Sequence, residues 1–87
     1  MMPPDDEIDL HDCMPYEVRM KLLPFLDQGY ADNWEKVHII HGKGEGVLRR
    51  VVWNILDELE YIEKYQLGSI YEGGQGMTVA IYAPDIP

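Results

Sequence analysis

Gly42, Gly44 and Gly46 alternate along the middle of the chain, with Lys43 between the first two and Arg49 shortly after the third. Glycine adopts backbone angles closed to other residues and lets a second group approach the main chain closely. An apolar helical pattern follows the loop, so its free N–H groups are delivered at a helix N-terminus, where anions are favoured. This arrangement predicts a phosphate-binding element, although a tight strand-to-helix connection without a ligand would use the same glycines.

The loop matches neither of two common phosphate-binding patterns. The P-loop pattern requires Gly-Lys followed by Ser or Thr, whereas Gly42 and Lys43 are followed by Gly44. The dinucleotide-binding pattern requires two residues between its second and third glycines, and only Glu45 separates Gly44 from Gly46. Both of these nucleotide-binding classes are therefore excluded.

Asp9 and His11 form a second group of residues that could do chemistry. Alternation over residues 7–11 predicts a strand with Ile8 and Leu10 on one face and with Asp9 and His11 on the other. Histidine titrates near neutral pH and can act as general acid or base in phosphodiester cleavage, with Asp9 orienting the ring. A structural Asp–His pair that closes a strand end is the alternative interpretation.

Periodicity predicts the order β-α-β-α-β-β, with Gly29 ending the first helix and Pro24 kinking or shortening it. The glycine-rich link 72–76 predicts an antiparallel hairpin between the last two strands. The predicted strands are residues 7–11, 37–40, 65–71 and 77–82, and the predicted helices are residues 15–28 and 47–63.

Helical crossovers make the first three predicted strands parallel, and right-handed connections place both helices on one face. The predicted fold class is therefore a two-layer α+β sandwich of the α/β type with a mixed four-stranded sheet. Ligands of open α/β sheets bind where parallel strands end, so His11, the glycine loop and the link 72–76 are expected to meet there. The predicted phosphate contacts are His41, Gly42, Lys43, Gly44, Gly46, Arg49, Gly73, Gly74 and Gly76.

The chain of 87 residues fits one small domain, with residues 1–6 as a disordered lead-in or linker stub and 83–87 as a tail. A net charge of −9 argues against nucleic acid, but residues 36–50 carry four cations against a single acid. Positive charge thus coincides with the glycine loop. A single cysteine excludes an internal disulfide, and the lack of a signal-peptide pattern or membrane-length apolar run predicts a cytoplasmic protein with no membrane partner.

The sequence predicts no metal site and no cofactor. No spacing of histidines and cysteines resembles a zinc site. Asp9, His11 and Asp12 offer oxygen and nitrogen ligands, so a divalent cation remains a weaker alternative.

Three short motifs follow one another along the chain. Ile8–Asp12 is similar to Leu-Asp-Leu-His-Gly, His41–Gly44 to Thr/His-Gly-x-Gly, and Glu72–Gly76 to Glu-Gly-Gly-x-Gly before an apolar strand. Together they resemble the Smr (small MutS-related) domain family over residues 7–82, nearly the whole chain.

The resemblance implies a fold similar to the C-terminal domain of a bacterial translation initiation factor, and binding of DNA or RNA, often with endonuclease or nicking activity. It implies that Asp9 and His11 are catalytic, that His41 shapes the loop, and that the chain could belong to a longer MutS-type protein. Asp12 stands where the family usually has glycine, which puts a carboxylate beside the expected phosphate site. Three functions are therefore open: an endonuclease on structured DNA or RNA, which we favour, a non-catalytic module that binds nucleic acid or the ribosome, and a protein-interaction domain.

Overall fold

The computed structural model describes residues 6–70 and 74–84. Parts of three predictions lie outside the described residues. These parts are residues 1–5 of the predicted lead-in, residues 85–87 of the predicted tail, and the predicted phosphate contact Gly73. The elements in chain order are β1 (Glu7–Asp9), α1 (Pro15–Ala31), β2 (Lys36–Ile40), α2 (Val47–Glu58), β3 (Ile62–Leu67), the 3-10 turn η1 (Gly74–Gly76) and β4 (Met77–Tyr82).

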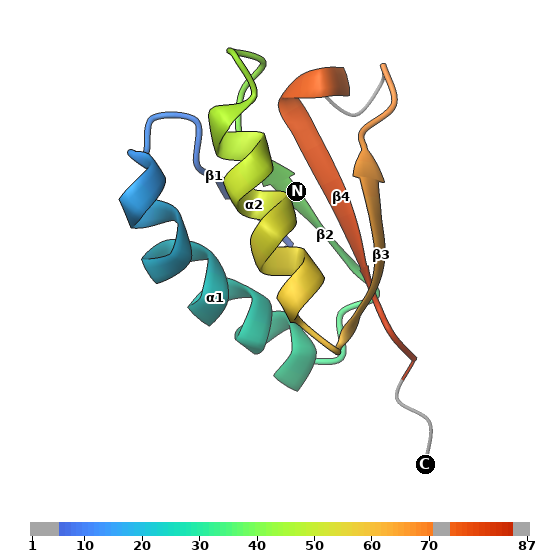
Figure 1. The fold of residues 1–87 in the computed structure, drawn as a ribbon. Coiled ribbons are helices and arrows are strands. Elements are labelled where there is room, and N and C mark those ends of the chain that lie inside the picture. The colour runs from blue at the N-terminus through green and yellow to red at the C-terminus, as the bar shows by residue number, and fades with distance from the viewer. Residues whose placement is uncertain (1–5, 71–73, 85–87) are drawn as a thin grey trace, which may run out of the picture.

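The four strands form one mixed sheet in the order β1-β2-β4-β3. β1 is parallel to β2, and β4 is antiparallel to both β2 and β3, so β1, β2 and β3 all run in one direction. Both helices cover the same face of this sheet (Figure 1). The predicted two-layer α+β fold is therefore confirmed, whereas its similarity to a translation initiation factor domain stays a prediction.

The hydrophobic core lies between the sheet and the two helices. Alternate strand residues turn towards the helices, so Leu10, Val37 and Ile39 are fully buried while Asp9 is exposed. Burying each aliphatic side chain contributes about 1.5–3 kcal/mol. The remaining fully or almost fully buried aliphatic residues of the core are Val18, Leu22, Leu26, Val52, Ile55, Leu56 and Ala80.

Helix α1 is longer than predicted. Pro15 occupies its first turn, where a missing N–H costs nothing, and the backbone N–H of Met14 donates to the Glu17 carboxylate at 2.8 Å. The helix then continues through Pro24 to Ala31, so Pro24 does not shorten it, and a kink at Pro24 stays a prediction. Buried leucines on both sides of this proline keep the helix on the core.

The prediction that Gly29 ends this helix is also wrong, because Gly29 is buried within it. A Cβ atom at this position would lie 2.2 Å from the Tyr82 hydroxyl and 2.5 Å from Cε3 of Trp34. Glycine is present because two aromatic side chains pack against its bare Cα, and the helix ends only at Ala31.

Further boundaries differ from the predictions, and β1 ends at Asp9 instead of at residue 11. Helix α2 ends at Glu58, not at residue 63, and β3 begins at Ile62, not at residue 65. Ile62 continues the helical apolar spacing of α2, but it is buried in the sheet opposite Tyr82. β3 ends at Leu67, and residues 68–70 lie outside the strand.

Candidate nucleic-acid interface

Three chain segments meet at the edge of the sheet where β1, β2 and β3 end. The carbonyl oxygen of Gly76 accepts hydrogen bonds from the backbone N–H groups of His41 and Gly42, each at 3.0 Å. A Cβ atom at Gly42 would lie 3.4 Å from Cβ of His11. The end of β1, the glycine loop after β2 and the turn before β4 are therefore in contact.

This edge contains a cavity of about 330 Å³. Its floor and walls come from the glycine loop and the first turn of α2, which begins at Val47 after Gly46. Gly46 has a φ of 84°, and its lack of a Cβ lets the guanidinium of Arg49 fold back over the loop. The cavity is lined by His11, His41, Gly42, Gly44, Glu45, Gly46, Val47, Leu48 and Arg49.

Most of the predicted phosphate contacts line this cavity, but three do not. Lys43 is exposed, and its Cγ lies 3.3 Å from the position that a Cβ of Gly76 would take. Gly76 is buried and supports the loop through its carbonyl, and Gly74 lies one turn away in η1. These three residues therefore belong to the surroundings of the cavity and not to its wall.

His11 lies at the rim of the cavity between two carboxylates. Its Nδ1 is 2.5 Å from Oδ1 of Asp9, and its Nε2 is 3.2 Å from Oδ2 of Asp12. The hydrogen bond to Asp9, followed by the charges of Asp12 and Asp9, raises the pKa of His11 above 6.5, and the same bond lowers the pKa of Asp9. With a carboxylate at each nitrogen, His11 is stabilised as a doubly protonated imidazolium.

His41 has the opposite environment. It is 3 % exposed, with Nδ1 3.0 Å from the Gly42 carbonyl and Nε2 2.7 Å from Oγ1 of Thr78. Burial lowers its pKa below 6.5, the carbonyl of Gly42 opposes that shift, and the charge of Arg49 adds to it. His41 is therefore a neutral, internally bonded side chain at neutral pH.

The two histidines are expected to titrate on opposite sides of pH 6.5. In an NMR titration, the ring C–H resonances of His11 should have their midpoint above 6.5 and those of His41 below it. Stability contributed by neutral His41 is present above pH 6.5 and is lost as the pH falls towards its folded-state pKa. Stability contributed by His11 is present below pH 6.5 and is lost as the pH rises through its folded-state pKa. The reverse order of midpoints would contradict both assignments.

Two residues of the site were missed from the sequence. Thr78 is fully buried in β4, and its Oγ1 accepts a hydrogen bond from Nε1 of Trp53 at 2.8 Å. Trp53 lies off the apolar face of α2 by helical spacing, yet it packs on the core and against Tyr65. The sign of this network in the sequence is the hydroxyl of Thr78, which stands at a core-facing position of a strand among apolar residues.

The Smr domain model matches residues 8–82 of this chain. The chain belongs to the Smr domain family. Two of its relatives are named Endonuclease MutS2. The one from Symbiobacterium thermophilum is 42 % identical to this chain over 74 residues, and the one from Fusobacterium nucleatum is 38 % identical over 77 residues. The alignments cover 85 % and 88 % of this chain but only 9 % and 10 % of those proteins.

Two solved structures share the fold of this Smr domain. The Smr domain of Thermus thermophilus MutS2 matches with a TM-score of 0.85 at 28 % identity, over 91 % of this chain and 99 % of the other. YdaL, a stand-alone small MutS-related protein from Escherichia coli, matches with a TM-score of 0.89 at 26 % identity, over 94 % of this chain and 67 % of the other.

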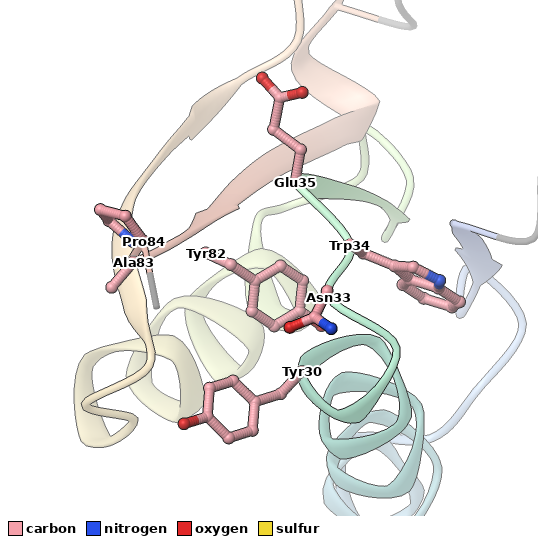
Figure 2. Close-up of a pocket in the computed structure, with 7 residues that line it drawn as sticks. All are labelled: Tyr30, Asn33, Trp34, Glu35, Tyr82, Ala83 and Pro84. Atoms are coloured by element: carbon pink, nitrogen blue, oxygen red, sulfur yellow. The ribbon is translucent and has the colours of Figure 1, made fainter. Parts of the chain in front are cut away.

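A second hollow, of about 300 Å³, lies at the opposite edge of this Smr domain (Figure 2). The rings of Tyr30 and Tyr82 form much of its wall, while the Trp34 ring and the Glu35 carboxylate point away from them (Figure 2). The Tyr82 hydroxyl donates to the carbonyl of Leu26 at 2.8 Å, so this ring serves packing. No residue that lines this hollow is basic, and it therefore suits phosphate poorly.

Within residues 6–70 and 74–84, no group of three or more His, Cys, Asp or Glu side chains could hold a metal ion. In the same part of the chain, no helix is both long enough and apolar enough to cross a membrane.

Proposed function

We propose that this Smr domain binds DNA or RNA at the glycine-loop edge and cleaves a phosphodiester bond there, with His11 as general acid. One observation carries the proposal: a single cavity combines the N-terminus of α2, the Arg49 guanidinium and the His11 imidazole. The names of the MutS2 relatives support the same activity.

Phosphate binding follows from the charge and the backbone of this edge. The N–H groups of the first turn of α2 have no partner within the helix and carry a partial positive charge. Arg49 lines the cavity and Lys43 lies exposed beside it, so two full charges add to that field. The chain as a whole carries −9, so binding should be weak at high salt and should depend on this edge.

Cleavage follows from the protonation state of His11. An imidazolium held by Asp9 at Nδ1 can donate its Nε2 proton to the sugar oxygen that leaves phosphorus. Water, or the 2′-hydroxyl of RNA, forms the new bond to phosphorus as the bond to the leaving oxygen breaks, and the attacking oxygen releases its proton to the solvent. Oδ2 of Asp12 lies 3.2 Å from Nε2 of His11, so the Asp12 carboxylate must first move away from that nitrogen.

The same contact favours a second candidate function, a binding module without cleavage. While Asp12 engages Nε2, the proton of His11 is not offered to a substrate.

The MutS2 relatives are about ten times as long as the matched segment, so we also propose that the Smr domain acts together with the rest of a longer MutS2-type chain.

Removing both cations at the cavity should weaken nucleic-acid binding. Lys43→Ala combined with Arg49→Ala is expected to lower affinity similarly for all sequences and to reduce the slope of log K against log salt by about 1.4–1.8, since each phosphate contact contributes about 0.7–0.9. Fluorescence anisotropy with one labelled oligonucleotide at several salt concentrations measures both effects. Lys64→Ala combined with Arg50→Ala removes the same charge from two exposed residues outside the cavity wall and is the matched control. Equal losses of affinity in the two double variants would show that binding depends on net charge and not on the cavity, which would contradict the proposal.

Asp12→Gly should separate the two candidate functions. A carboxylate about 5 Å from a bound phosphate costs on the order of 1 kcal/mol at surface-like dielectric, so its removal should tighten binding about fivefold at low salt. Freeing Nε2 of His11 should also raise cleavage. If the variant cleaves less and a chelator has the same effect on the wild type, Asp12 is a cation ligand; if neither protein cleaves, the binding module is the better assignment.

A further inference from the structure

We propose that Trp53 and Thr78 are positioning residues of the glycine loop, which hold the His41 ring in place and thereby keep the carbonyl of Gly42 away from a bound phosphate. The proposal rests on the proposed phosphate site. It concerns side chains that do not themselves line the cavity.

The hydrogen bonds between these residues have only one consistent direction. The indole Nε1–H of Trp53 can only donate, so Oγ1 of Thr78 accepts from it at 2.8 Å. The Thr78 hydroxyl donates to Nε2 of His41 at 2.7 Å, because Nε2 is the unprotonated nitrogen of the neutral ring. The ring proton must be on Nδ1, since the Gly42 carbonyl, 3.0 Å from Nδ1, can only accept.

The last of these bonds fixes the peptide between Gly42 and Lys43. Gly42 has a φ of 84°, and a glycine in this region tolerates rotation of its neighbouring peptide plane more readily than other residues do. A carbonyl turned towards the cavity would present partial negative charge to an anion. The Nδ1–H of His41 holds the carbonyl on the protein side, and in a trans peptide the N–H of Lys43 then points the opposite way.

The network joins three elements to the loop. Trp53 comes from α2 and Thr78 from β4, while His41 follows β2. The guanidinium carbon of Arg49 lies over the same indole, 5.6 Å from the ring centroid. One side chain therefore positions both the loop backbone and the cation of the cavity.

The test compares Thr78→Val, which keeps the shape and removes the hydroxyl, with Thr78→Ser, which keeps the hydroxyl. Nitrogen-15 NMR of the imidazole ring should show His41 protonated at Nδ1 in all three proteins, with Nε2 hydrogen-bonded in the wild type and in Thr78→Ser, and with the Nε2 resonance shifted in Thr78→Val because its donor is lost. The amide resonance of Lys43 should move in Thr78→Val alone. Affinity for a labelled oligonucleotide at low salt should fall about fivefold in Thr78→Val, the usual effect of one lost hydrogen bond, and return in Thr78→Ser.

Trp53→Phe is the second variant, because it keeps an aromatic ring and removes the N–H donor. It should loosen the Thr78 hydroxyl, shift the Nε2 resonance of His41 and lower affinity, and it decides the question if Thr78→Val does not fold. A wild-type His41 protonated at Nε2, or an unchanged ring and Lys43 amide in both folded variants, would overturn the proposal. If the wild type binds no oligonucleotide, the proposed function fails, while the ring and amide spectra still decide whether the network sets the loop.

Discussion

His11→Ala is expected to reduce cleavage by a factor of about 10²–10⁴ while leaving nucleic-acid affinity largely intact. The imidazolium would act in proton transfer, because its Nδ1 is held by Asp9 and its Nε2 faces the edge of the cavity beside Asp12. Phosphate is held by other groups, namely the N-terminus of α2 and Arg49. A plasmid-nicking time course, repeated with structured RNA, measures the rate, and anisotropy measures the affinity.

His38→Ala is the matched control for this experiment. It removes an imidazole from the middle of β2, where Nδ1 lies 3.6 Å from Asp6 and outside the cavity wall, so cleavage should persist. Each protein is assayed with and without chelator, which shows whether a divalent cation assists the reaction. Undiminished cleavage by His11→Ala would place the active site elsewhere or reveal a contaminating nuclease.

Gly29→Ala should lower the free energy of unfolding by about 2 kcal/mol. Alanine gains about 1 kcal/mol in helix propensity over glycine. That gain is outweighed because the new Cβ would lie 2.2 Å from the Tyr82 hydroxyl, and overpacking costs about 1–3 kcal/mol. Moving the buried Tyr82 ring also breaks its hydrogen bond to Leu26, which costs about 1–3 kcal/mol more.

Urea unfolding followed by circular dichroism measures this loss. Gly44→Ala is the control, since a Cβ there meets no atom within 4 Å, and its free energy of unfolding should change by no more than about 0.5 kcal/mol. A Gly29→Ala protein as stable as the wild type would show that Tyr82 and Trp34 can move aside without cost.

The element order and the location of the candidate site are properties of the sequence itself. Alternation in β1 and the β-branched run of β2 report which face each side chain takes, because the period of a strand is two residues. The apolar series of α2 reports one helical face in the same way. Since helical crossovers make β1, β2 and β3 parallel, the C-terminal ends of these strands share one edge of the sheet, and His11 and the glycine loop lie at that edge.

Contacts between residues distant in the sequence decided two element boundaries and the environment of His41. Local spacing predicts that a helix ends at Gly29, but Gly29 is helical because Tyr82 packs on it. Local spacing also predicts a helix at Ile62, but Ile62 belongs to β3 because it pairs with Tyr82. His41 is neutral because it is buried, and its ring is held in place because Thr78, 37 residues away, bonds it. Periodicity reports a side chain's face but not its partner, so the packing around Gly29 and the bonds of His41 followed only from the tertiary structure.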